Sequence, residues 1–207
     1  MARKVKKLPV RDRFVIITNG RQSEKNYFEI IRANRKSLYK IDVRYFNDDP
    51  EGLINQAINI KNDDNRVWCV FDKDEFSDDS IYRAVRRAKQ NEIGIAFSNA
   101  AFEVWLINHF RKFEAEKNPK ELISILDEML KQYGYSKGYE KNDEKVIKEV
   151  FLERMEEACN NANIIYQRRV VECKRRNVTE YPICDWNSFT TVHLLLEALQ
   201  ISNTQLQ

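Results

Sequence analysis

Several residue types and segments that mark specialised proteins are scarce in this chain of 207 residues. Its four cysteines are widely spaced and include no Cys-x-x-Cys pair, which argues against a zinc site and against a disulfide framework. No apolar run approaches the roughly 18 residues that a membrane span requires, and no apolar segment follows the basic opening at residues 1–7, as a secretory leader would need. We therefore expect a cytoplasmic protein with reduced thiols and no membrane partner.

Glycine, proline and net charge are also low. With five Gly and four Pro, 43% hydrophobic and 32% charged residues, the composition is typical of a globular chain with one large domain, or a domain with an appendage. A net charge of +3 does not by itself indicate nucleic-acid binding, because steering depends on clustered charge. Two basic clusters could bind phosphates, although a solvated helix face is the alternative for each. They are Arg83, Arg86, Arg87 and Lys89, and Arg168, Arg169, Lys174, Arg175 and Arg176.

Hydrophobic periodicity in the first half of the chain alternates between strand and helix. Short apolar or alternating segments predict strands, and apolar residues at helical spacing predict a helix after each strand. Asn99 is the expected N-cap of the last of these helices. This order predicts a parallel sheet with helices on its faces. The expected strands are 14–18, 41–46, 67–72 and 93–97, and the expected helices are 24–36, 50–62, 77–91 and 100–110.

After residue 112 the pattern changes to helices alone. Segments 120–133, 143–176 and 187–199 have helical spacing with no convincing strand between them, and two glycines separate the first two segments. The sequence thus predicts an α/β domain over residues 1–112, with a parallel sheet of about four strands flanked by helices. A helical appendage over residues 113–207 is expected to pack on it.

An acidic segment ends the third expected strand. The apolar run 67–71 does not alternate, which predicts a strand buried on both faces, and Asp72, Asp74 and Glu75 follow it. Ligands of open α/β sheets bind beyond the carboxyl ends of the strands. Hard oxygen ligands at that position suit Mg²⁺ or Mn²⁺. The alternative is a solvated acidic loop that caps the next helix.

Three segments follow the ends of expected strands in a particular order. They read Ile17-Thr-Asn-Gly-Arg-Gln-Ser-Glu-Lys-Asn-Tyr-Phe28, Asp72-Lys-Asp-Glu75 and Phe97-Ser-Asn-Ala-Ala-Phe-Glu-Val-Trp-Leu-Ile-Asn-His-Phe110. In order and spacing they resemble the RloB-like family, a Toprim-related group associated with bacterial restriction and abortive-infection loci. The resemblance is strong over residues 12–112 and weaker beyond, and it implies a Toprim-like fold.

The resemblance implies roles for several residues. The metal-binding Asp-x-Asp of Toprim domains corresponds to Asp72 and Asp74, and Glu75 extends that acidic cluster. Glu24 matches the second Glu of the family's Glu-Gly-x-x-Thr-Glu turn, with Ser23 in place of Thr. The family's Ser-Asn-x-x-Phe-Glu-x-Trp segment and its trailing His are matched by Ser98, Asn99, Phe102, Glu103, Trp105 and His109.

Glu103 and the two histidines also have readings that need no resemblance. On an otherwise apolar helix a paired or liganding Glu103 is more common than a free one, so it is a site candidate. His109 lies near the expected helix end, where histidine more often contacts terminal carbonyls or packs in the core than takes part in catalysis. His193 is expected to be structural.

One position departs from the family pattern. Toprim domains have a Glu directly before the residue that matches Gly20, and this chain has Asn19 there. An amide cannot take up a proton at neutral pH and is a weaker ligand than a carboxylate. Either Glu24 or Glu103 supplies the missing carboxylate, or catalysis has been lost and binding kept, or the sequence was altered here. A tight turn that tolerates positive φ would explain Asn19 and Gly20 without any chemistry.

The resemblance implies a Mg²⁺- or Mn²⁺-dependent nuclease (phosphodiesterase) of the Toprim type, acting on DNA or RNA in bacterial anti-phage or abortive-infection defence. Asp72 and Asp74 would hold the metal, and Asn19, Glu24 and Glu103 would form the catalytic set. The alternative is a catalytically degenerate Toprim-like subunit that binds nucleic acid or a nucleotide and acts with an ATPase partner. A purely structural interaction protein is a third possibility, and the sequence leaves the oligomeric state open.

Overall fold

The computed structural model describes residues 13–73 and 76–201. Strands and helices alternate through the first half of the chain, which confirms the order predicted from periodicity. The strands are β1 (Arg13–Thr18), β2 (Lys40–Tyr45), β3 (Asn65–Asp72) and β4 (Gly94–Asn99), and the helices are α1 (Ser23–Asn34), α2 (Pro50–Ile60), α3 (Asp78–Gln90) and α4 (Glu103–Asn108).

The four strands form a parallel sheet in the order β2-β1-β3-β4. In the central strand β3, Cys69, Val70 and Phe71 are buried, as expected for a strand that is covered on both faces. Trp68 near its amino end is only half-buried. The Trp68 ring lies over Gly94 of β4, where an added Cβ would come within 2.2 Å of the ring.

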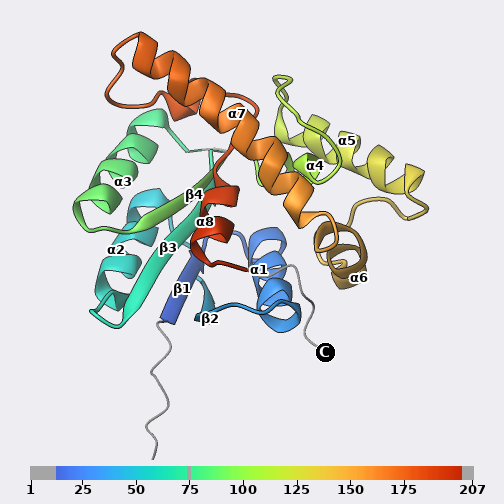
Figure 1. The fold of residues 1–207 in the computed structure, drawn as a ribbon, viewed down its shortest axis with the longest axis horizontal. Helices are drawn as coiled ribbons and strands as arrows, with labels where there is room; N and C mark the ends of the chain where they lie inside the picture. The colour runs from blue at the N-terminus through green and yellow to red at the C-terminus, as the bar shows by residue number, and fades with distance from the viewer. Residues whose placement is uncertain (1–12, 74–75, 202–207) are drawn as a thin grey trace, which may run out of the picture.

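Helices cover both faces of the sheet, so the hydrophobic core is divided in two (Figure 1). On one face, α2 and α3 contribute residues such as Leu53 and Ile81 to a core with Val15 and Ile17 of β1. On the other face, α1 contributes Tyr27 and Phe28, and the core continues away from the sheet into the C-terminal half of the chain. The alternation of side chains along each strand produces this division.

The C-terminal half is mainly helical, as predicted, but its elements differ from the expected ones. The expected helix 120–133 is confirmed, whereas the expected helix 143–176 contains a π-helix and a break. Ile147, Val150 and Phe151 of the π-helix are buried. The observed elements are α5 (Pro119–Gln132), α6 (Glu144–Val146), the π-helix Ile147–Phe151, α7 (Met155–Arg175), a 3₁₀-helix Ile183–Asp185 and α8 (Val192–Ala198).

The prediction of a single helix over 187–199 was wrong, because a short strand, β5 (Phe189–Thr190), precedes α8. β5 pairs antiparallel with β4 and makes the sheet five-stranded. The pairing includes a 3.0 Å hydrogen bond between the hydroxyls of Ser98 and Thr190. Two residues are too few to produce an alternating pattern, and the partner strand lies about 90 residues earlier in the chain. The sheet therefore draws strands from both halves of the sequence.

The N-cap prediction for Asn99 was also wrong. β4 continues to Asn99, and α4 begins only at Glu103, after Phe102. The Asn99 amide instead donates to the backbone carbonyls of Ile183 (3.2 Å) and Cys184 (2.7 Å). These carbonyls come from a distant segment, which local capping rules do not take into account.

No helix in the described part of the chain is long and apolar enough to cross a membrane.

Candidate functional site

A polar cavity of about 410 Å³ lies where the carboxyl ends of β1 and β3 meet the start of α1. This is the edge at which ligands of parallel sheets bind. Its lining comes from the β1–α1 turn, the β2–α2 turn, the end of β3 and the segment before α6. The lining residues are Asn19, Gly20, Arg21, Gln22, Ser23, Glu24, Asn47, Asp48, Asp72, Phe76 and Lys141.

Asp72 is the last residue of β3 and pairs in register with Ser98 of β4. Its Oδ2 accepts a 2.9 Å hydrogen bond from the backbone N–H of Phe102, in the turn that leads to α4. The buried sheet on one side and this backbone donor on the other hold the carboxylate at the cavity. Asp72 therefore stands where the sequence predicted a metal ligand, and Asp74 and Glu75 lie outside the described residues.

Asn19 follows β1, and its backbone N–H donates to the Val70 carbonyl at 3.3 Å, so it is held against β3. Its side-chain Oδ1 is buried and has no hydrogen-bond partner among residues 13–73 and 76–201. A buried acceptor without a donor is costly, and a cation in the adjoining cavity would satisfy it. The position that lacks a carboxylate thus still has a side-chain oxygen, on a residue that lines the cavity.

The absence of a side chain at Gly20 leaves room for the Glu24 carboxylate, and it is not required by a positive φ. Neither Asn19 nor Gly20 has a positive φ, so the tight-turn explanation does not hold in that form. A Cβ on Gly20 would come within 1.7 Å of Glu24 Oε2, and any side chain there would displace the carboxylate. Glu24 lies in the first turn of α1 and is 6% exposed. The positive end of the helix dipole stabilises its negative charge.

Glu103, the first residue of α4, is 2% exposed. Two residues from the C-terminal half of the chain, Tyr139 and Lys141, connect it to the cavity. Glu103 Oε1 accepts a 3.1 Å hydrogen bond from the Tyr139 hydroxyl and lies 3.4 Å from Lys141 Nζ. The Tyr139 hydroxyl is also 3.3 Å from Ser23 Oγ, beside Glu24. Lys141 in turn lines the cavity together with Asp72. Asn19 to Glu24 and Asp72 therefore line one cavity, and Glu103 is connected to it through Tyr139 and Lys141.

Sequence reasoning missed Tyr139 and Lys141. They lie in the connection between α5 and α6, where neither periodicity nor motif spacing marks a site. The signal that could have been used is a tyrosine directly after Gly138 and a lysine three residues after it, in a turn. That pattern does not indicate which part of the fold the turn contacts.

Three other candidates lie outside the cavity lining, in the packed interior. Ser98 and Asn99 are 1% exposed and bind Thr190 and Cys184, so they hold the C-terminal segment to the sheet. His109 is fully buried, with its ring nitrogens bonded to the Tyr27 hydroxyl (3.1 Å) and to carbonyls of its own helix turn. Burial lowers the pKa of His109 to about 3, so the ring is neutral at physiological pH. The core explanation for His109 fits this arrangement.

The two basic clusters on the helices are partly neutralised. Arg83 forms an ion pair with Glu51 at 2.8 Å, and Arg86 one with Glu180 at 2.9 Å. Arg168 of α7 pairs with Glu114. Exposed ion pairs of this kind contribute little stability, and their arginines are already occupied by carboxylates.

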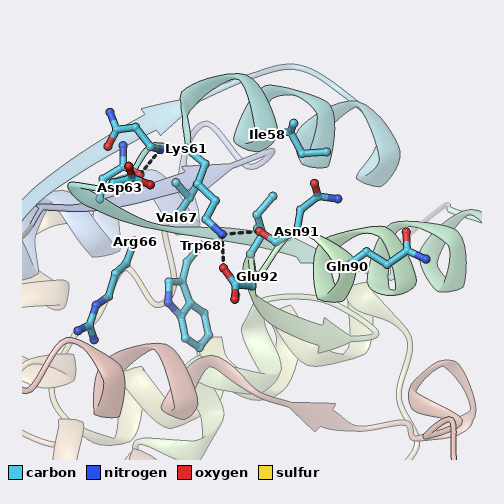
Figure 2. A pocket seen from close by; sticks show the side chains of 13 residues that line it. Ile58, Lys61, Asp63, Arg66, Val67, Trp68, Gln90, Asn91 and Glu92 are labelled. Atoms are coloured by element: carbon cyan, nitrogen blue, oxygen red, sulfur yellow. Dashed lines mark hydrogen bonds and ion pairs between the residues drawn. The ribbon is translucent and has the colours of Figure 1, made fainter.

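A larger cavity of about 970 Å³ lies at the opposite end of the sheet, by the amino ends of β3 and β4 (Figure 2). Its lysine, Lys61, donates to the Asn91 carbonyl at 2.6 Å and to the Glu92 carboxylate at 2.9 Å (Figure 2). Volume alone favours this cavity. Lys61 is already paired, however, and the Arg66 guanidinium lies over the rings of Phe14 and Tyr39. The cavity also lies at the edge where ligands of parallel sheets seldom bind, so we place the candidate site in the smaller one.

The oxygen donors of the smaller cavity suit a hard divalent cation. In the part of the chain that the structure describes, no three His, Cys, Asp or Glu side chains are grouped closely enough to enclose a metal. Mg²⁺ does not need such a cage, because it keeps most of its waters and uses one or two carboxylates together with phosphate oxygens. Asp72 and Asn19, whose Oδ1 has no partner within the described part of the chain, supply oxygens of that type.

The whole chain was also compared with known proteins. No curated protein and no solved structure matches it significantly. A family model described as RloB-like protein matches residues 14–199, and it therefore includes the candidate site, α5 to α7 and the fifth strand. With most of its length covered by that model, the chain belongs to the RloB-like family.

Proposed function

We propose that this protein is a Mg²⁺- or Mn²⁺-dependent phosphodiesterase that cleaves DNA or RNA, as one component of a bacterial anti-phage or abortive-infection system. The observation that carries the proposal is the cavity in which Asp72, Glu24 and Asn19 meet at the carboxyl edge of the sheet. The defence setting and an ATPase partner are what the RloB-like resemblance implies.

In this proposal Asp72 and Asp74 hold the metal, and the carbonyl oxygen of Asn19 is a further neutral ligand. The bound metal would polarise the scissile phosphate and lower the pKa of a bound water. Asp72 is suited to this role because the Phe102 N–H fixes one of its oxygens. A ligand with a fixed orientation loses little conformational entropy when it binds.

Glu24 is the best candidate for the proton acceptor that Asn19 cannot provide. Its carboxylate lies over Gly20 in the same cavity as Asp72. Glu103 is less suited, because it does not line the cavity and reaches it only through Tyr139 and Lys141. We therefore assign Glu24 as the general base and Glu103 as the residue that orders the neighbouring side chains.

Cleavage of a mixed set of labelled DNA and RNA tests the proposal, with and without Mg²⁺ or Mn²⁺. Asp72→Asn keeps an oxygen that can accept from the Phe102 N–H but removes the charge. We expect cleavage to fall by about 100-fold or more, beyond the roughly 10- to 100-fold typical of residues that only support metal ligands. Asp63→Asn, which removes a carboxylate at the opposite end of the sheet, is the matched control and should leave the rate unchanged.

The second candidate function is a binding subunit without catalysis, and Asn19 is the observation that favours it. In that case the parent protein cleaves none of the substrates with either metal, while Asp72→Asn still weakens its binding to an oligonucleotide or a nucleotide. Metal-dependent cleavage that Asp72→Asn abolishes would exclude this alternative.

A further inference from the structure

The segment between α5 and α6 carries two polar residues from the C-terminal half of the chain into the candidate site. Its position is set by Asp127 of α5, whose Oδ1 accepts from the Tyr139 backbone N–H at 3.1 Å. Gly138 makes that contact possible, because it has a φ of +74° and a Cβ there would come within 1.6 Å of Asp127 Oδ1. Lys131 donates to the other carboxylate oxygen of Asp127 at 2.6 Å. The segment is therefore anchored to α5.

A second anchor lies on the site itself. The Tyr139 hydroxyl is between Ser23 Oγ (3.3 Å) and Glu103 Oε1 (3.1 Å). Burial, and after it the negative charge of Glu103, raises the pKa of Tyr139 far above its ordinary value, so the hydroxyl stays protonated and donates to Glu103. Tyr139, two residues before Lys141, is thus bonded to α5 through its backbone and to the candidate site through its hydroxyl.

Lys141 extends from these anchors into the cavity. Its Nζ lies 3.4 Å from Glu103 Oε1, and its side chain is 47% exposed while that of Glu103 is 3% exposed. Lys141 thus contacts a buried carboxylate and also lines the cavity, and its ammonium group carries three donors. Glu103 and Tyr139 restrict the positions that the ammonium can adopt.

A phosphodiester could bind in this cavity more easily if a cation offset the negative charge of its carboxylates. Its lining includes three carboxylates, Glu24, Asp48 and Asp72, and two cations, Arg21 and Lys141. A phosphodiester entering this cavity is repelled by the carboxylates unless positive charge offsets them. Arg21 and Lys141 are both exposed, and the Lys141 ammonium lies 3.4 Å from the buried Glu103 carboxylate, which is itself bonded to Tyr139.

We infer that Lys141 is a substrate-binding residue of this site, which holds a backbone phosphate of the nucleic acid beside the phosphate that is cleaved. Tyr139 is its positioning residue and acts through Glu103. This inference rests on the proposed function and adds to it that the site is shared between the two halves of the chain.

Two binding measurements test this role in the full-length protein. Fluorescence anisotropy with a labelled single-stranded oligonucleotide in EDTA reports phosphate binding without cleavage. Calorimetric titration with Mn²⁺ alone reports the metal site. The variants are Lys141→Met, the charge-preserving Lys141→Arg, and Lys137→Met as the matched control, because Lys137 is exposed on the same segment and does not line the cavity.

We expect Lys141→Met to weaken oligonucleotide binding about tenfold, the scale of one hydrogen bond to a charged group. It should also reduce the slope of log K against log salt by about 0.7, the value for one phosphate contact on a single strand. Mn²⁺ binding should be unchanged or tighter, because a cation next to the metal site is removed. Lys141→Arg and Lys137→Met should behave like the parent protein.

Opposite results separate the failure of this inference from that of the proposed function. If the parent binds the oligonucleotide and Lys141→Met binds it equally well with the same salt slope, the inference is wrong and the function stands. If Lys141→Met loses Mn²⁺ and oligonucleotide binding together, Lys141 only maintains the fold of the site, and the inference is again wrong. A parent protein that neither binds nor cleaves any nucleic acid overturns both.

Discussion

Asn19 is the residue whose side chain has the least satisfied environment in the candidate site. Its buried Oδ1 lacks a partner among the described residues although it adjoins the cavity that Asp72 and Glu24 line. A carboxylate in its place would add negative charge at the same point, and with it both a stronger ligand and a proton acceptor.

The first prediction is that Asn19→Glu raises Mn²⁺ affinity and the cleavage rate. A positioned general base typically contributes about 10²- to 10⁴-fold, so even part of that gain is measurable over a weak background. Mn²⁺ titration and single-turnover cleavage are the measurements, and Asn19→Gln is the control because it adds length without charge. Cleavage that Asn19→Glu leaves unchanged but Glu24→Gln abolishes would show that Glu24 already has this role.

The second residue-scale prediction concerns Gly20. In Gly20→Ala the new methyl group displaces the Glu24 carboxylate, since the methyl carbon would otherwise lie only 1.7 Å from Glu24 Oε2. We expect a large loss of cleavage with little change in thermal stability, because the displaced group is the end of a flexible side chain. Circular dichroism melting and cleavage assays check both. Unchanged cleavage would contradict the assignment of Glu24 as the base.

At the scale of elements, the connection between α5 and α6 combines two glycines that differ in one respect. Gly134 and Gly138 both have positive φ, at +92° and +74°. A Cβ on Gly134 meets nothing within 4 Å, whereas one on Gly138 meets Asp127. The pair therefore separates backbone strain from the displacement of the segment that carries Tyr139 and Lys141.

The third prediction uses this pair. Gly134→Ala and Gly138→Ala should each lose about 1–2 kcal/mol of unfolding free energy from left-handed backbone strain. Only Gly138→Ala should also weaken oligonucleotide binding, because it breaks the contact between Tyr139 N–H and Asp127. Urea unfolding and anisotropy distinguish the two effects. Equal binding by both variants would show that the segment does not contribute to the site.

The elements also show how far the sequence could be interpreted. The alternation of β1 to α4 was predictable because hydrophobic period reports which face of a strand or helix is buried. The position of Asp72 was predictable because ligands bind beyond the carboxyl ends of parallel strands, whereas Glu24 was a candidate only through the family resemblance. β5 and the π-helix were not predictable, since each depends on packing against residues far away in the chain. Lys141 was missed for the same reason, because its place beside Asp72 depends on how α5 packs.

At the scale of the whole molecule, two neutral histidines lie in the interior. Burial lowers the pKa of His109 to about 3 and that of His193 to about 4, from an ordinary value of 6.5. His193 is 0% exposed, and neither of its ring nitrogens has a partner among the residues that the structure describes. As pH falls below 6.5, the unfolded chain takes up protons that the folded chain cannot, so stability decreases with decreasing pH.

The fourth prediction is that the free energy of unfolding falls between pH 7.5 and 5, by up to about 1.4 kcal/mol per pH unit for each histidine. His193→Leu should remove the contribution of one histidine from this pH dependence. It should cost little stability at pH 7.5, because it breaks no hydrogen bond. Urea unfolding at several pH values measures both. The range stays above the titration of most carboxylates, so a slope that His193→Leu does not reduce would contradict the assignment.

The fifth strand has a consequence for how the chain folds during synthesis. β4 is complete at residue 99, but its edge partner, β5, and the helix α8 that packs on the β4 region are made about 90 residues later. At roughly 5–20 residues per second this leaves an interval of about 5–20 s. During that time the nascent chain presents an unpaired strand edge and an uncovered apolar face. We therefore expect neighbouring nascent chains to associate more readily before β5 and α8 are made than afterwards.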